Sequence, residues 1–162
     1  MSTITIQQKG ITDIPADAIV NAANSGLWAG GGVCGAIFRK AGYDELTAAC
    51  EEIGHCDEGS AVITPGFGCS CKHIIHAVGP QYLDGKHGER DALYGAYKRS
   101  LELCVETDIH SIVFPLISAG IFGYPVREAW TVAINACKDF IIGYRNYNLD
   151  KSLQFLKMKR QK

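Results

Sequence analysis

Twice along this chain, a short apolar stretch leads into a glycine-rich loop and then into a helical pattern. The apolar stretch Ala18–Asn21 precedes Gly30-Gly31-Gly32 and a helix that we expect over Gly35–Ala41. The apolar stretch Ser111–Leu116 precedes a second loop, Ser118–Gly123, and another helical pattern. A strand, a loop and a helix in this order form the repeating unit of parallel sheets. The sequence therefore predicts an α/β protein whose mostly parallel sheet is covered on both faces.

Hydrophobic periodicity predicts further elements around these two units. Apolar residues that alternate with polar ones indicate strands, and apolar residues three and four apart indicate helices. Asp91 is a candidate cap for the long central helix. The additional strands are expected at Thr3–Gln8, Ser60–Thr64 and His73–Val78, and the additional helices at Tyr43–Ile53, Asp91–Glu106 and Val126–Ile142.

Polar or glycine-rich segments follow three of these strands, at Asn21–Asn24, Gly79-Pro80 and Ser118–Gly123. In open parallel sheets, ligands bind outside the carboxyl ends of the strands. Glycines there permit positive φ and close approach of a ligand, and the helix that follows directs free N–H groups at an anion. One such loop is equally compatible with a tight turn, but two loops at one edge match the size of a diphosphate. Neither loop has the sequence of a Walker A motif.

Composition excludes several other classes of protein. The chain has 162 residues and a net charge of −1, which fits one domain without a strong field for nucleic acid. Seven cysteines, no secretory leader and no long apolar run predict a reduced, cytoplasmic protein. Cys69-Ser70-Cys71 lacks the second pair of ligands that a zinc site needs. His76 is expected to make a structural hydrogen bond rather than to act in catalysis. We therefore expect no metal, no cofactor and no membrane contact.

Four motifs in order resemble the macro domain family, and most closely its MacroD-type ADP-ribose binders and hydrolases. They are Asp17–Asn24 (DAIVNAAN), Gly30–Ile37 (GGGVCGAI), Ile75–Pro80 (IHAVGP) and Ser118–Pro125 (SAGIFGYP), and the resemblance extends from about Thr3 to about Phe140. It implies a three-layer α/β/α fold around a mixed sheet, with ADP-ribose as the ligand. It also implies removal of ADP-ribose from acidic side chains, or of acetate from O-acetyl-ADP-ribose.

The resemblance assigns roles to residues at this predicted site. Asn24 would bond the distal ribose hydroxyls and serve catalysis, although its side chain is also suited to capping a nearby turn. Ile11 would flank the adenine, and backbone amides of the two loops would bind the diphosphate. The implied ligand-binding residues are Ile11, Ala22, Asn24, Gly31, Gly32, Val33, Ser118, Ala119, Gly120, Ile121, Phe122 and Gly123.

Some residues depart from the family pattern. Gly10 stands where an aspartate usually accepts a hydrogen bond from adenine, and the neighbouring acid Asp13 is the candidate to replace it. Cys34 and Phe38 stand where the hydrolases have aspartate and histidine. Thiols at helix N-termini ionise more readily, so Cys34 is a candidate catalytic thiolate; alternatively it is a small packing residue.

The C-terminal segment also departs from the family. We expect a macro domain over residues 1–142 and a divergent basic tail over 143–162, with no strong strand near Leu153 and Phe155. A missing strand would leave a neighbour in the sheet unpaired and lower stability.

Two classes of function follow from these residues. The first is a hydrolase acting on mono-ADP-ribosyl esters or on O-acetyl-ADP-ribose. The second is a non-catalytic module that binds ADP-ribose or a related nucleotide, which Cys34 and Phe38 favour. A weaker alternative is binding of RNA or poly-ADP-ribose by the basic run Lys151–Lys162. We expect a monomer whose partners are ADP-ribose or ADP-ribosylated proteins, and we do not expect nucleic-acid binding.

Overall fold

A six-stranded mixed sheet forms the centre of the computed structural model, which describes residues 3–144 and 152–156. The strand order is β1-β6-β5-β2-β4-β3. All neighbouring strands pair in parallel except β3 and β4, so the sheet is mixed but mostly parallel, as expected. The strands are β1 (Thr3–Gln7), β2 (Ala18–Ala23), β3 (Ala61–Pro65), β4 (His73–Val78), β5 (Ser111–Phe114) and β6 (Ser152–Leu156).

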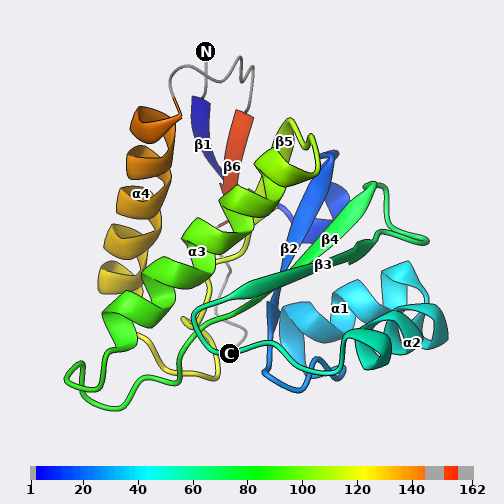
Figure 1. The fold of residues 1–162 in the computed structure, drawn as a ribbon, viewed down its shortest axis with the longest axis horizontal. Helices are drawn as coiled ribbons and strands as arrows, with labels where there is room; N and C mark the ends of the chain where they lie inside the picture. The colour runs from blue at the N-terminus through cyan, green and yellow to red at the C-terminus, as the bar shows by residue number, and fades with distance from the viewer. Residues whose placement is uncertain (1–2, 145–151, 157–162) are drawn as a thin grey trace.

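Helices cover both faces of the sheet and give the expected three layers (Figure 1). Side chains that alternate along each strand feed two cores. In β2, Ala18 and Val20 pack into the core that contains α3 and α4, whereas Ile19 and Ala23 pack into the core beneath α1 and α2. No helix within the described residues is long and apolar enough to cross a membrane. The helices are α1 (Gly32–Ala41), α2 (Tyr43–Ile53), α3 (Glu89–Glu106) and α4 (Val126–Gly143), and a short 3-10 turn, η1, covers Ile11–Asp13.

The expectation that no strand follows α4 is wrong. β6 lies between β1 and β5 and pairs in parallel with both, so that residue 153 is the register partner of Ile4 in one strand and of Ile112 in the other. The strand therefore joins β1 to the rest of the sheet. The basic residues at 157–162, and Lys151, lie outside the described residues.

Several expected element boundaries also differ from the structure by one to three residues, and those of α1, α3 and β5 have a physical explanation. α1 begins at Gly32 rather than Gly35, because glycine's weak helix propensity hid the first turn. Asp91 is not a cap: α3 begins at Glu89, its N-cap position is Gly88, and no side chain caps it. β5 ends at Phe114, immediately before Pro115, which has no N–H to donate to a neighbouring strand.

Truncation tests the importance of β6. A chain that ends at residue 142 loses the strand between β1 and β5, so we expect its melting temperature to fall by more than about 10 °C. A chain that ends at residue 156 keeps every described strand and is expected to melt like the full chain. Thermal unfolding followed by circular dichroism makes the comparison. A cooperative melt of the 1–142 chain at the full-length temperature would show that β6 contributes little.

Candidate ligand-binding site

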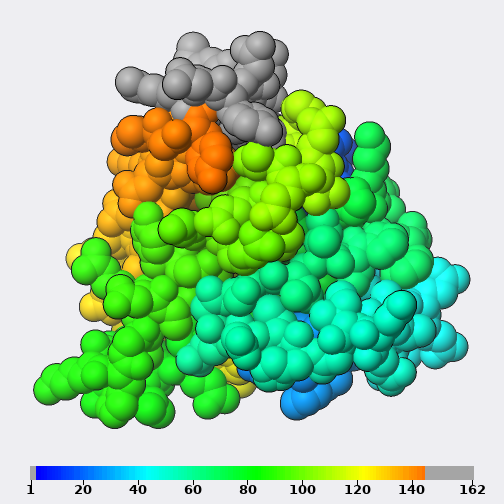
Figure 2. Space-filling view, viewed as in Figure 1, coloured from blue at the N-terminus to red at the C-terminus, as the bar shows by residue number. Residues whose placement is uncertain are grey.

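Three loops meet at the edge formed by the carboxyl ends of β2, β4 and β5, at the bottom of Figure 1. The loop after β4 is tied to the loop after β5 by a hydrogen bond from the Tyr82 N–H to the Phe122 carbonyl, 2.8 Å long. The loop after β2 leads into α1 at the same edge. In Figure 2 the lower outline of the molecule is indented between the blue atoms of the first loop and the green and yellow atoms of the other two. The expected convergence of the three segments is thus confirmed.

The loop after β2 is folded around the side chain of Asn24. Its Nδ2 donates to the Trp28 carbonyl at 2.9 Å, and its Oδ1 accepts from the Trp28 N–H at 3.2 Å. Asn24 therefore makes the turn-capping contact that the sequence left open. Each end of the amide still has capacity for one further hydrogen bond, so a ligand hydroxyl could bind to it as well.

Cys34 supports the same loop from within the protein. Its side chain is buried, and its Sγ accepts from the Gly30 N–H at 3.4 Å and lies 3.9 Å from the Trp28 carbonyl. The thiol thus contacts two backbone groups of the loop. In this arrangement Cys34 holds the loop in shape, which is the packing alternative considered for it.

The first glycine loop exposes backbone at the N-terminus of α1. Gly31 is the N-cap and no side chain caps the helix, while Gly32 has a φ of 60°. All three residues from Gly30 to Gly32 are exposed, and Val33 is half-buried. Gly35 has to be glycine, because a Cβ there would lie 2.8 Å from the Gly30 carbonyl oxygen. The free N–H groups and positive dipole of this helix end suit an anion.

The second loop adopts a strained turn above the end of β4. Ser118 has a φ of 66°, which is unusual for a residue other than glycine, and Gly123 has a φ of 72°. The Tyr124 N–H donates to the Ser118 carbonyl at 2.9 Å and closes the turn. No hydrogen bond to another described residue uses the N–H groups of 120–122, so they remain available to a ligand.

Gly79 is the residue that lets the second loop pack so closely. A Cβ on Gly79 would lie 2.2 Å from Ser118 Oγ and 2.5 Å from Ile117 Cγ2. Ser118 Oγ is itself buried without a partner among the described residues. The sequence placed Gly79-Pro80 after a strand at the expected ligand-binding edge. It could not show why residue 79 is glycine, because the reason is a contact with a loop far along the chain.

The remaining predicted site residues differ in exposure. Ile121 is 92% exposed, Ala119, Phe122 and Ala22 are half-buried, and Gly120 is exposed. Ile11 begins η1 and is buried in the core beneath α1 and α2, so only a small part of its surface can meet a ligand.

The short turn η1 brings Asp13 beside Gly10. The Asp13 N–H donates to the Gly10 carbonyl at 2.9 Å, and a Cβ on Gly10 would lie 2.8 Å from Asp13 Oδ2. The Asp13 carboxylate therefore occupies the space beside Gly10 that a side chain there would use. Although Asp13 is three residues away from position 10 in the sequence, the turn brings its carboxylate next to that position.

His76 belongs to a buried polar cluster beneath α2. Its Nδ1 accepts from Asn21 Nδ2 at 3.0 Å, and its Nε2 lies 3.0 Å from Thr64 Oγ1, whose own proton goes to the Pro65 carbonyl. Burial lowers the pKa of His76 to about 4, so the ring is neutral at pH 7. The expected structural hydrogen bond of His76 is confirmed, and the ring lies inside the core rather than in the site.

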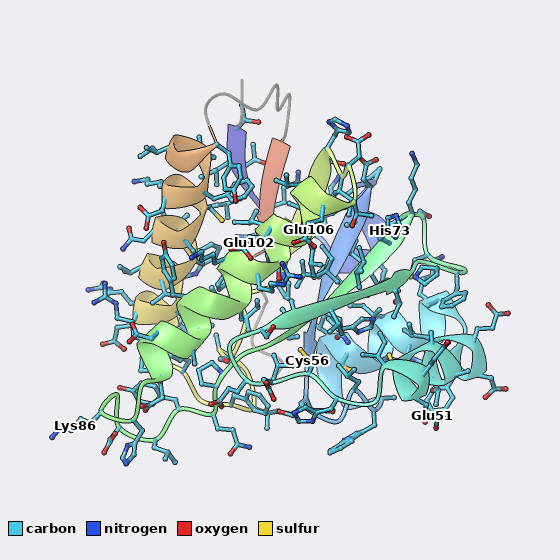
Figure 3. The ribbon with its side chains drawn as sticks, viewed as in Figure 1. Glu51, Cys56, His73, Lys86, Glu102 and Glu106 are labelled. Carbon is cyan, nitrogen blue, oxygen red and sulfur yellow. The ribbon has the colours of Figure 1, made fainter. Side chains whose placement is uncertain are left out.

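Glu89 organises the loop that precedes α3, at the lower left of Figure 3, where Lys86 is labelled. Its buried carboxylate accepts backbone N–H groups from Leu83, Asp84, Gly85 and His87. Although burial acts to raise it, these donors lower the pKa of Glu89 to about 2. Asp84, His87 and Glu89 are close enough to share a metal ion, but the Glu89 oxygens already serve the loop. The predicted absence of a metal stays a prediction.

Comparison with known proteins identifies the class. The family model described as Macro domain matches residues 20–133, so the chain belongs to the macro domain family. It is 51% identical over 132 residues to an uncharacterized protein of Fusobacterium nucleatum, covering 81% of this chain and 75% of the relative. It is 46% identical to the O-acetyl-ADP-ribose deacetylase of Salmonella typhimurium, covering 88% of this chain and 82% of the relative. A mutant Oceanobacillus iheyensis macrodomain with ADPR superposes with a TM-score of 0.86 at 34% identity, covering 96% and 85% of the two chains.

The neutral, buried His76 predicts a loss of stability in acid. The unfolded chain binds a proton at the ordinary pKa of 6.5, whereas the folded chain binds it only near 4. The free energy of unfolding is therefore expected to fall by roughly 3 kcal/mol as the pH drops from 6.5 to 4. In His76→Gln this part of the pH dependence should disappear. Urea unfolding at several pH values measures it, and an equally steep loss in the variant would contradict the assignment.

Proposed function

We propose that this macro domain binds ADP-ribose, with the diphosphate held by backbone N–H groups of the two glycine loops. The observation that carries the proposal is the uncapped N-terminus of α1 at the same sheet edge as the unpaired N–H groups of 120–122. Two sets of amide donors suit two linked phosphates and need no lysine. The bound ADPR of the Oceanobacillus relative, with which this chain superposes over 96% of its length, supports the same ligand.

Residues at the two ends of this edge are assigned to the distal ribose and to the adenine of the ligand. Ala22 and Asn24 approach the distal ribose, and the spare donor and acceptor of the Asn24 amide bind its hydroxyls. Gly31, Gly32 and Val33 contact one phosphate. At the other end of the ligand, the exposed Asp13 carboxylate accepts the adenine amino group beside Gly10 and Ile11. The second loop, Ser118–Gly123, covers the diphosphate, with Phe122 against the distal ribose.

The reaction we propose is hydrolysis of an ester on the distal ribose. Water cleaves the ester that joins the ribose to an acyl group: one fragment takes the OH of the water and the other takes the remaining proton, which gives free ADP-ribose and the carboxylic acid. The diphosphate and Asn24 position the water, and the loop amides stabilise the charge of the bound ligand. The deacetylase name of the Salmonella relative, 46% identical over 147 residues, supports this class of reaction.

A second candidate is a module that binds ADP-ribose without turnover. The observation that favours it is the position of Cys34, where the hydrolases that the sequence resembles have an aspartate. Its buried Sγ contacts the Gly30 N–H and offers no carboxylate to a water molecule. Binding of ADP-ribose needs no carboxylate at position 34, because the ligand is held by the backbone amides of the loops.

One pair of measurements separates the candidates. We expect calorimetry with free ADP-ribose to give a one-to-one complex, and O-acetyl-ADP-ribose to be converted to ADP-ribose and acetate. Binding with no release of acetate would select the non-catalytic module. A calorimetric titration with no heat, repeated at a second temperature, would overturn both candidates.

The role of Cys34 has its own test. Because its thiol holds the loop, Cys34→Ala is expected to weaken ADP-ribose binding about threefold, the effect of one lost weak hydrogen bond. The turnover number at saturation should change by less than about twofold, and Cys34→Ser should restore affinity. Cys71→Ala, at the opposite end of the sheet, is the matched control. A fall in turnover above about 100-fold with unchanged affinity would instead assign the thiolate a catalytic role.

A further inference from the structure

Trp28 is an exposed aromatic residue in the loop that connects β2 to α1. It is 65% exposed, and no hydrogen bond joins its indole N–H to another described residue. Its backbone, in contrast, is held on both sides: Asn24 bonds its N–H and its carbonyl, and Cys34 Sγ approaches that carbonyl. The chain thus fixes this residue firmly while leaving most of its side chain in solvent.

The position of the indole depends on Gly26. A Cβ on Gly26 would lie 1.7 Å from Cζ3 and 2.0 Å from Cε3 of the Trp28 ring, so the benzene part of the indole lies directly on the glycine backbone. A ring supported in this way loses little conformational entropy when something packs on its free surface. Tryptophan combines a large apolar area with a donor N–H, and it is enriched among residues that dominate binding energy.

We propose that Trp28 binds the polypeptide that carries the ADP-ribosylated side chain. The inference rests on the proposed function, because the acceptor is attached at the distal ribose, the end assigned to Asn24. The two hydrogen bonds between Asn24 and Trp28 keep the indole beside that end of the ligand. A peptide leaving the distal ribose can pack against the indole, whereas an acetyl group is too small to cover it. Trp28 therefore favours protein-linked ADP-ribose over free ADP-ribose and O-acetyl-ADP-ribose.

The test uses a synthetic peptide that carries ADP-ribose on a glutamine side chain through an amide bond, which resists ester hydrolysis. We expect the wild-type chain to bind this conjugate about tenfold more tightly than free ADP-ribose in calorimetry. Trp28→Leu should bind both ligands alike, with its affinity for free ADP-ribose within about twofold of wild type, while Trp28→Phe should keep part of the preference. Phe67→Ala, which removes an exposed aromatic at the other end of the sheet, is the matched control and should keep all of it.

Fluorescence gives an independent readout. The chain has two tryptophans, so Trp130→Phe leaves Trp28 as the only emitter. The conjugate should shift the emission of Trp28 to shorter wavelength, because it removes water from the ring, and free ADP-ribose should shift it much less. Equal affinity of the wild type for conjugate and free ADP-ribose would overturn the inference and leave the proposed function intact. Absence of ADP-ribose binding would overturn the proposed function and the inference together.

Discussion

The parallel pairing of β2 with β4 on one side and β5 on the other is the constraint on which the site depends. This pairing brings the carboxyl ends of three strands, and hence three loops, to one edge. Its register is marked by a buried polar contact: Asn21 and His76 are direct partners in the ladder, and their side chains are hydrogen-bonded. A slip of one residue would turn Asn21 toward the apolar core of α3 and α4 and leave His76 without its donor. The cluster inside the core therefore helps to hold the loops outside it in place.

The binding that we propose at this edge relies on backbone groups rather than on side-chain charge. The exposed residues Gly31 and Gly32 bring backbone N–H groups to the surface, and the second loop does the same with a strained Ser118. That strain is maintained because Tyr124 closes the turn and Gly79 lets it settle onto β4. A net charge of −1 is compatible with an anion site built this way, since helix ends and turns supply the local positive potential.

Local sequence patterns predicted most of the helices and strands and the two glycine loops of the site, but not the contacts that hold those loops in shape. The sequence predicted α2 and β4 with the bounds that the structure shows. α2 has one clear apolar face, β4 is a mostly apolar run buried on both faces, and a glycine follows each element. β6 escaped prediction because it is a five-residue strand in a polar, basic segment, and its partners lie far away along the chain. The glycine loops were evident from the sequence. The need for glycine at position 79 was not, because it depends on a contact with residues 117–118. The two hydrogen bonds between Asn24 and the Trp28 backbone depend on the folded shape of the loop.

The contacts that shape the loop between β2 and α1 involve the backbone of Trp28 but not its indole ring. Asn24 and Cys34 both contact the backbone of 28–30. In the complex that we propose, changes at either residue would therefore reach the diphosphate and distal ribose through the loop. The indole of Trp28 takes no part in those contacts, since it lies outward on Gly26. We therefore expect a substitution of this side chain to alter which acceptor is preferred without disturbing the amides that we propose hold ADP-ribose. On this proposal, backbone groups recognise the nucleotide, and the exposed ring of Trp28 recognises the polypeptide to which the nucleotide is attached.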